Sequence, residues 1–341
     1  MIALRIRPHV PRSAVALCAA VLLAPLGILG CGTSSSAAGA ATARIYVSNQ
    51  LDDTVSVIDG ATRKVVKTVR VGVSPAQMAV SSDRRSIYVA NTGSDTVSVL
   101  DTDSDTVART IALPRGSRPI GVALSPDGRD LYTADGGTDR VSVIDTAAKR
   151  VVTSVRVGTQ PLSVVAAPDG KTIYSADSGS GHVSVIDART RRVVRAIAAG
   201  RFPSGVAVTP DGASLYVTGE LSGVTVVNAR NGTVAARLRE PSPTSVAMSP
   251  DGTRAYVTGL GPGKLTAIDT RTHRVASTAS VGPYGTDPFT VRATGDAVYV
   301  ADQGASTLSV IDQGTLKTMA TIKTGSSPYG IAVVHPGPVG R

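Results

Sequence analysis

Tryptophan is absent from the 341-residue sequence, and phenylalanine occurs only twice, whereas tyrosine occurs nine times. A large core must therefore be built mostly from valine, isoleucine, alanine and leucine, of which the first two favour the pleated surface of a β-sheet. Cysteine occurs only as Cys18 and Cys31, and Cys18 falls in a leader that we expect to be removed. A single mature cysteine excludes a disulfide framework and a cysteine-based metal site.

Histidine and glutamate are also scarce. The expected mature chain contains His182, His273 and His335 as its histidines, and Glu220 and Glu240 as its glutamates. The strand pattern described below places the three histidines in different loops and turns, so a three-histidine zinc site is not expected. No Gly-x-Ser-x-Gly elbow supports a nucleophilic serine, and no glycine-rich phosphate loop precedes a helix.

The N-terminus has the pattern of an export signal. Residues 5–12 carry three arginines, and an apolar run extends from Ala14 to Leu29. That run has about 16 residues, fewer than the about 20 that a transmembrane helix needs. A positive region, a short apolar region and small residues predict a signal peptide over residues 1–30.

Cys31 stands where a bacterial lipoprotein signal places its acylated cysteine. Glycine, serine and alanine dominate the following residues and suit a flexible tether, which we predict over residues 31–43. The protein is therefore expected to be extracytoplasmic and anchored to the membrane by lipid on Cys31. Ordinary cleavage after Ala40 is the alternative.

Internal repetition dominates the remaining sequence. A tyrosine preceded by an aliphatic residue recurs at intervals of 40 to 44 residues, and a Ser-Val-Ile-Asp-like run follows each about ten residues later. A Pro-Asp-Gly turn precedes four of these tyrosines, and two further apolar runs complete each unit. Four short strands in about 42 residues are typical of a propeller blade. The repeat tyrosines are Tyr46, Tyr88, Tyr132, Tyr174, Tyr216, Tyr256 and Tyr299.

The two ends of the repeat region complement each other. We name the strands A, B (with the tyrosine), C (Ser-Val-Ile-Asp) and D. The region starts with a B strand at Tyr46 and ends with an unmatched A strand at residues 330–334. We predict an all-β, seven-bladed propeller over residues 44–334, with four antiparallel strands per blade and a ring closed by the C-terminal strand joining the N-terminal blade. A tail follows over residues 335–341.

The motifs Tyr-Val-Ser-Asn (46–49) and Tyr-Val-Ala-Asn (88–91), together with Ser-Val-Ile-Asp and Ser-Pro-Asp-Gly, resemble the YVTN-type β-propeller repeats of bacterial and archaeal surface proteins. The resemblance covers roughly residues 44–334 and implies a surface-located seven-bladed propeller. The fourth motif position departs from asparagine in the later repeats, where it is Asp135, Asp177, Gly219, Gly259 and Asp302.

The residues outside the repeat pattern suggest a ligand site. In a propeller, the D–A and B–C loops share one face. All four aromatic residues outside the tyrosine repeat are expected in D–A loops, where exposed aromatic side chains suit recognition. An alternative is that these side chains only plug the channel mouth. The predicted ligand-binding residues are Phe202, Tyr284, Phe289 and Tyr329, with the polar neighbours Gln77, Arg118, Gln160 and Asp287.

Four acidic residues at or near the ends of B strands are weak candidates for a divalent cation such as Ca²⁺. They are Asp135, Asp177, Glu220 and Asp302. An aspartate at a strand end also commonly caps a turn, and no other cofactor is expected.

Three functions remain open. We expect a non-catalytic, membrane-anchored binding or scaffold protein that holds a small-molecule or protein ligand on the D–A face and is a monomer. A metal-dependent propeller enzyme of the lactonase or lyase type is the alternative, so whether the chain is an enzyme is undecided. The resemblance implies single-stranded nucleic-acid binding as a second alternative. That partner is not expected, because most basic residues fall on the opposite face from the aromatics.

Overall fold

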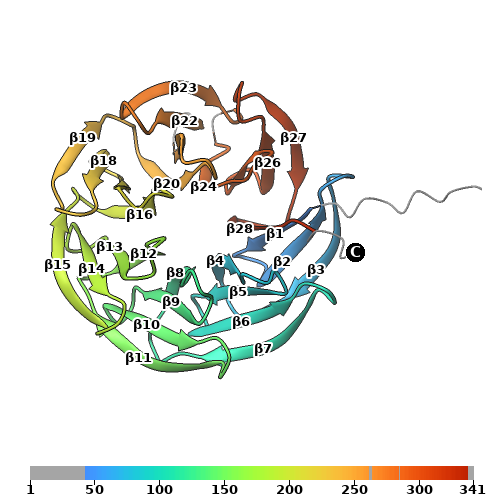
Figure 1. Cartoon of the computed structure of the whole chain (residues 1–341). Helices are drawn as coiled ribbons and strands as arrows, with labels where there is room; N and C mark the ends of the chain where they lie inside the picture. The colour runs from blue at the N-terminus through green and yellow to red at the C-terminus, as the bar shows by residue number, and fades with distance from the viewer. Residues whose placement is uncertain (1–42, 261–262, 284, 337–341) are drawn as a thin grey trace, which may run out of the picture. The chain divides into compact units, whose positions relative to one another are not determined.

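Seven four-stranded antiparallel sheets are arranged in a ring in the computed structural model, which describes residues 43–260, 263–283 and 285–336 (Figure 1). This arrangement confirms the predicted all-β, seven-bladed propeller, and the described residues contain no helix. The first strand begins at Arg44 and the last ends at Val334. The predicted signal peptide, Cys31, and Tyr284 lie outside the described residues.

The four strand classes occupy successive positions from the centre of the ring outward. The A strands are β4 (Pro75–Val80), β8 (Pro119–Leu124), β12 (Pro161–Ala166), β16 (Pro203–Val208), β20 (Pro243–Met248), β24 (Pro288–Ala293) and β28 (Pro328–Val334). The B strands are β1 (Arg44–Asn49), β5 (Ser86–Asn91), β9 (Asp130–Asp135), β13 (Thr172–Asp177), β17 (Ser214–Gly219), β21 (Arg254–Gly259) and β25 (Val298–Asp302). The C strands are β2 (Thr54–Asp59), β6 (Thr96–Asp101), β10 (Arg140–Asp145), β14 (His182–Asp187), β18 (Gly223–Asn228), β22 (Lys264–Asp269) and β26 (Thr307–Ile311). The D strands are β3 (Lys64–Arg70), β7 (Thr106–Ala112), β11 (Arg150–Arg156), β15 (Arg192–Ala198), β19 (Val234–Leu238), β23 (Arg274–Ser280) and β27 (Thr318–Lys323).

The C-terminal strand closes the ring. Blade 1 has the strand order β28-β1-β2-β3, whereas blades 2 to 7 are each built from four consecutive strands. β28 pairs antiparallel with β1, with Ile45 opposite Val333 and Val47 opposite Ile331. The predicted closure is therefore confirmed, and it joins the two ends of the described chain in one sheet.

Burial is greatest in the B and C strands and least in the outer D strands, whereas the A strands at the centre are partly buried. Each B strand is buried along nearly its whole length, because both faces of its sheet pack against neighbouring blades. The D strands are mostly exposed, as in β3, where only Val69 is buried. Arginine and lysine side chains occupy these outer edges, and charged edge strands resist edge-to-edge aggregation.

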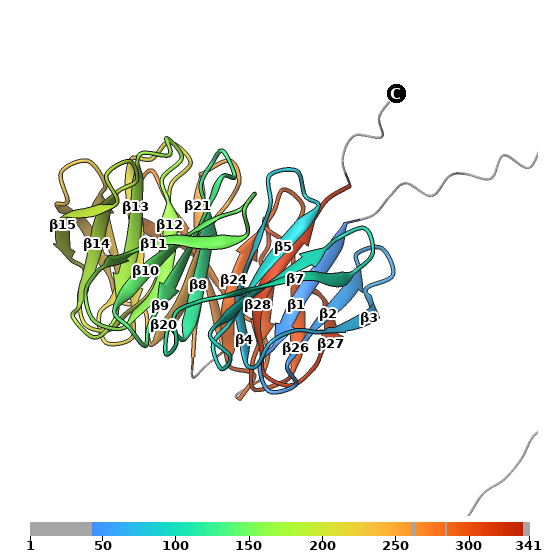
Figure 2. The ribbon, with the colours of Figure 1, turned by 90° about the horizontal axis from the view of Figure 1, so that it is seen from below.

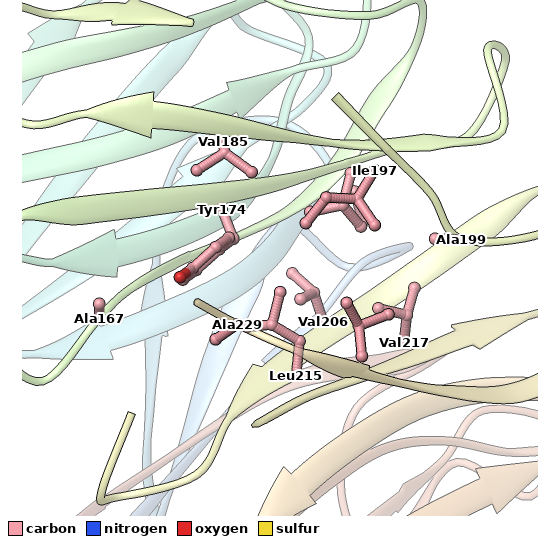
Figure 3. Close-up of a cluster of buried hydrophobic side chains, with 12 residues drawn as sticks. Ala167, Tyr174, Val185, Ile197, Ala199, Val206, Leu215, Val217 and Ala229 are labelled. Carbon is pink, nitrogen blue, oxygen red and sulfur yellow. The ribbon is translucent and has the colours of Figure 1, made fainter. Parts of the chain in front are cut away.

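The hydrophobic core is divided into clusters between adjacent blades. In the cluster between blades 4 and 5, Tyr174 and Val185 of blade 4 pack against Val206, Leu215 and Val217 of blade 5 (Figure 3). Every blade thus packs its apolar side chains against both neighbouring blades. The apolar surface of a blade is therefore buried only when both neighbours are in place.

Besides its packing in the core, the repeat tyrosine can form a hydrogen bond with the next blade through its hydroxyl. The Tyr46 hydroxyl donates to Asp105 Oδ1 at 2.6 Å, and the Tyr216 hydroxyl lies 2.8 Å from His273 Nδ1. Both partners lie in the C–D turn of the following blade. Arg44 Nη1 also contacts Asp105 Oδ2 at 2.6 Å, so an ion pair reinforces the boundary between blades 1 and 2.

The loops and turns divide between the two faces of the ring, as predicted. Figure 2 shows the ring from the side, with the loops and turns at the two ends of the strands. The Thr92 amide in a B–C loop donates to the Ser74 carbonyl in a D–A loop at 3.0 Å. On the other face, the Thr102 amide in a C–D turn donates to the Arg85 carbonyl in an A–B turn at 3.0 Å.

Removal of residues 328–334 is expected to unfold the whole ring. The deletion exposes the unpaired edge of β1 and removes Ile331 and Val333 from the cluster between blades 7 and 1. Circular dichroism should then record no cooperative melting transition. A chain that ends at Pro336 retains β28 and is the control, which should melt like the full chain. A cooperative transition in the deletion variant would contradict the role assigned to β28.

Candidate functional site

Four predicted ligand residues share one position in the repeat. Arg118, Gln160, Phe202 and Asp287 each precede the proline that begins an A strand, and their φ angles are 49°, 52°, 53° and 48°. A positive φ is unfavourable for residues other than glycine. All seven blades nevertheless place a residue in this conformation at the same position, including Ser74, Ser242 and Ser327.

Backbone hydrogen bonds hold these pre-proline residues in place. The carbonyls of Arg118, Gln160 and Phe202 each accept a bond from the residue that follows the neighbouring B strand. Their equivalents in the other four blades do the same. In three blades an aspartate of the B–C loop also accepts a bond from the pre-proline amide, as Asp139 does from Gln160 at 2.9 Å. The position therefore belongs to the architecture of the repeat, whichever side chain it carries.

Phe202 lies apart from the other described aromatics. Its side chain is 44% exposed, and the Arg201 guanidinium carbon lies 5.8 Å from the centre of its ring. Phe202 does not line the central cavity described below. The structure thus places it on the rim of blade 5.

Phe289 and Tyr329 form a pair. Their ring centres are 4.8 Å apart, with an angle of 54° between the planes. They are not in D–A loops, as the sequence suggested, because each is the second residue of an A strand, in β24 and β28 respectively. The strands begin two residues earlier than expected, at the proline; β28 begins at Pro328 and not at Gly330. The same position in blades 2 to 6 holds Ala76, Ile120, Leu162, Ser204 and Thr244.

Hydrogen bonds fix the backbones that carry this pair. The hydroxyls of Thr244 and Thr258 in blade 6 donate to the Phe289 carbonyl at 2.7 and 3.0 Å. On the other side, the Gly330 amide next to Tyr329 donates to Ser48 Oγ at 2.7 Å. The backbones that carry the two rings are therefore held by hydrogen bonds from blade 6 and within blade 1, and the rings also contact each other.

The pair lines a cavity of about 610 Å³ at the centre of the ring. All seven A strands contribute to its wall, which combines apolar side chains with a nearly equal polar surface that includes serine and threonine hydroxyls. Burial raises the pKa of the Tyr329 hydroxyl to about 12, so this group is neutral and can donate a hydrogen bond.

Gln77 also belongs to this wall. Its side-chain amide, from blade 2, donates to Thr290 Oγ1 of blade 7 at 3.3 Å. Blade 1 lies between them and has Gly330 at the equivalent position. A Cβ on Gly330 would lie 2.3 Å from the Ala76 carbonyl oxygen, so this close approach of β28 to β4 requires glycine.

The four acidic candidates are not brought together. Asp135, Asp177, Glu220 and Asp302 belong to blades 3, 4, 5 and 7, and no group of three or more potential metal ligands occurs among the residues that the structure describes. The three aspartates are almost fully buried within their own blades. Each accepts a bond from a C-strand serine; Ser142 donates to Asp135 Oδ2 at 2.5 Å.

Burial changes the titration of these carboxyls. It raises the pKa of Asp135 and of Asp302 to about 7, although the bonds from neighbouring hydroxyls act in the opposite direction. Asp302 Oδ1 has no hydrogen-bond partner among the described residues. In blades 1 and 2 the same position holds the neutral Asn49 and Asn91, whose amides donate to Ser56 and Ser98.

The family is shown by a match that spans nearly the whole chain. The model of the YNCE-like β-propeller family matches residues 9–339. The chain belongs to this family. A search of curated proteins gave no match.

Solved structures similar to this YNCE-like propeller include a chain of the Kuenenia stuttgartiensis hydrazine synthase, with a TM-score of 0.70 and 26% identity over 80% of this chain and 92% of that chain. A functionally unknown protein from Desulfotomaculum acetoxidans has a TM-score of 0.73 and 16% identity, over 86% and 99% of the two chains. The dihydro-heme d1 dehydrogenase NirN, solved in complex with DHE, has a TM-score of 0.63 and 16% identity, over 82% and 63%. The last two likenesses show the fold alone. Among the described residues of this YNCE-like propeller, no helix is long and apolar enough to cross a membrane.

Replacing Asp135 with asparagine is expected to stabilise this YNCE-like propeller at pH 8. A carboxyl with a raised pKa contributes stability while it is protonated. That contribution is complete below the ordinary pKa of 3.8 and is lost as the pH rises through about 7. Asparagine does not titrate and suits the same site in blades 1 and 2. The gain at pH 8 is roughly 1–4 kcal/mol, since one pKa unit corresponds to about 1.4 kcal/mol.

Thermal melting between pH 4 and pH 8 measures this effect. Wild type should lose stability relative to Asp135→Asn as the pH rises, and Asp302→Asn should behave in the same way. Asn91→Asp is the matched reverse variant, and it should lose stability over the same interval. Parallel pH profiles for wild type and Asp135→Asn would show that the carboxyl does not titrate in this way.

Proposed function

We propose that this protein is a non-catalytic binding protein, anchored outside the cytoplasm, that holds a small molecule in the mouth of its central channel. The observation that carries the proposal is the contact between Phe289 and Tyr329 at the wall of a cavity of about 610 Å³. Ligand pockets typically have volumes of about 300–1,000 Å³ and an apolar lining with a few polar groups.

The position of the aromatic pair favours binding over mere plugging of the channel. Only blades 7 and 1 have aromatic residues at the second position of the A strand, so the pair occupies one sector of the wall. A ligand can therefore stack on this sector while the rest of the cavity stays open to its remaining groups. Aromatic side chains provide large contact areas and prefer such tilted or stacked arrangements.

The metal-dependent enzyme is the alternative, and one similar solved structure carries the name of an enzyme, hydrazine synthase. The arrangement of the acidic residues does not favour it here. Asp135, Asp177 and Asp302 are buried in separate blades, where each accepts hydrogen bonds from its own serine. A catalytic cation needs several of these oxygen ligands at one point.

The membrane anchor is proposed from the sequence. Residues 5–12 and the apolar run to Leu29 form a secretory signal, and Cys31 follows where an acylated cysteine is expected. Acyl chains on Cys31 would hold the propeller at the membrane surface through the tether, and the channel would then face molecules outside the cytoplasm.

Replacing Phe289 or Tyr329 with alanine is expected to weaken ligand binding by at least about tenfold, because buried aromatic anchors contribute most of the binding energy at such sites. Thermal-shift measurements on purified mature protein provide the screen, with wall sugars, lactones, divalent metals and short single-stranded DNA as probes. A bound ligand raises the melting temperature of the native state.

Phe202→Ala is the matched control, because it removes an aromatic side chain from a D–A loop outside the cavity. Its ligand shifts should equal those of wild type. An organic ligand that stabilises wild type and Phe289→Ala equally would exclude the aromatic pair as the site. A shift with DNA that falls steeply with salt would instead support the nucleic-acid alternative.

Replacing Cys31 with serine is expected to abolish lipid attachment. Mass spectrometry of the wild-type protein from bacterial membranes should find an acylated N-terminus at Cys31, and labelled palmitate should enter wild type but not Cys31→Ser. An unmodified mature chain that begins after Ala40 would refute the anchor.

A further inference from the structure

The fifth residue of each A strand is small in every blade except blade 7. In that blade it is Arg292, in β24. The equivalent residues of the other blades are Ala79, Ala123, Val165, Ala207, Ala247 and Ala332. The position can be compared between blades because its backbone partner is always the repeat tyrosine, as Ala247 pairs with Tyr256 and Arg292 with Tyr299.

The small side chain at this position normally packs between two blades. Ala247 of blade 6 packs against the cluster that contains Val291 of blade 7, and Ala207 of blade 5 belongs to the cluster with Val246 of blade 6. Arg292 belongs to none of the hydrophobic clusters. Like its smaller equivalents in blades 2 to 6, it lines the central cavity, but its side chain is exposed there.

Arg292 is the single charged residue among the residues that line this cavity. No carboxylate within the described ranges forms an ion pair with it. Its guanidinium therefore carries a positive charge into a channel whose wall supplies no negative charge. The Arg292 side chain is accessible to solvent in the channel, but the strands that surround the channel desolvate it in part and lower its pKa from the usual value, because desolvation disfavours the charged form.

This environment strengthens the attraction of an anion. Charges interact more strongly near low-dielectric walls than in bulk water, and a partly desolvated cation gains most from a partner of opposite sign. Guanidinium has five N–H donors in a planar fork, which can bind both oxygens of a carboxylate or phosphate. Hydroxyls of the cavity wall, such as those of Ser245 and Ser163, can supply further donors.

We propose that the central channel binds an organic anion, with its carboxylate or phosphate at Arg292 and an apolar or aromatic part against Phe289 and Tyr329. The proposal rests on the proposed binding function and specifies its ligand class. Phe289 and Arg292 are three residues apart on β24, and a strand rises about 3.3 Å per residue. The two contacts are thus about 10 Å apart along the channel wall.

Isothermal titration calorimetry with four probes tests the charge requirement. Benzoate, phenyl phosphate and inorganic phosphate carry the anion, and benzyl alcohol is the uncharged counterpart. Wild type should bind phenyl phosphate and benzoate more tightly than benzyl alcohol. Arg292→Ala should weaken binding of the anionic probes by about tenfold or more, and Arg292→Lys should retain part of the affinity because it keeps the charge without the planar fork.

Folding is not expected to limit this test. Arg292→Ala introduces the residue that five other blades have at this position. Its melting temperature should be equal to or above that of wild type, because the substitution removes an unpaired cation. Arg201→Ala, which removes a rim arginine outside the cavity, is the matched control and should leave all affinities unchanged.

The outcomes separate this inference from the proposed function. If neutral and anionic aromatic probes bind equally and depend on Phe289 but not on Arg292, the binding function stands and the anion proposal is overturned. If the anions depend on Arg292 but not on Phe289 or Tyr329, the cation site stands and the aromatic mouth is refuted. Absence of anion binding to wild type at millimolar concentration overturns the inference.

Discussion

Pairing between β28 and β1 is the interaction on which the rest of the ring depends. The core of this protein lies between blades, so each blade needs a neighbour on both faces. Without the pairing, Ile45 and Val47 would lose the cover of Ile331 and Val333, and blade 7 would lose the surface against which Tyr299 packs. Apolar side chains exposed in this way no longer contribute the free energy of their burial, and each adjoining cluster is destabilised in turn. The ion pair between Arg44 and Asp105 adds a polar contact to the next boundary in the ring.

The same closure assembles the candidate site. Phe289 and Arg292 come from β24, and Tyr329 comes from β28, which belongs to the blade that contains the first strand of the chain. The hydroxyls of Thr244 and Thr258 donate hydrogen bonds to β24, and Ser48 accepts one from β28, so that both strands are held at the channel. The blades that depart most from the repeat at the channel wall are therefore the two that meet at the closure. Under the proposed function, ligand binding depends on ring closure, because an open ring would separate Tyr329 from the other two side chains.

The fold could be predicted from sequence because the same constraints recur seven times. Each repeat tyrosine occupies an equivalent position between blades, and a proline begins each A strand. The period, the number of strands and the closure could therefore be predicted. Phe289 and Tyr329 were also recognisable, as aromatics outside the repeat, although they were expected in loops. Arg292 is not among the predicted site residues, because it departs from the repeat only when the A strands are aligned on their prolines. In that alignment an arginine stands where the other blades have five alanines and one valine. The buried state of Asp135 and Asp302 depends on packing between strands, which a residue type at a strand end does not reveal.

The residue before each A-strand proline has a left-handed backbone conformation, and its side chain can vary without changing the fold. Its conformation is maintained by backbone hydrogen bonds, and none of the seven side chains is buried. Serine, arginine, glutamine, phenylalanine and aspartate all occur there within this one molecule. The propeller thus displays seven side chains in a circle on one face, each on an equivalent backbone and each independent of the core. Substitutions at these positions could give related chains different recognition surfaces on an unchanged scaffold, in the way that hypervariable loops diversify antibodies.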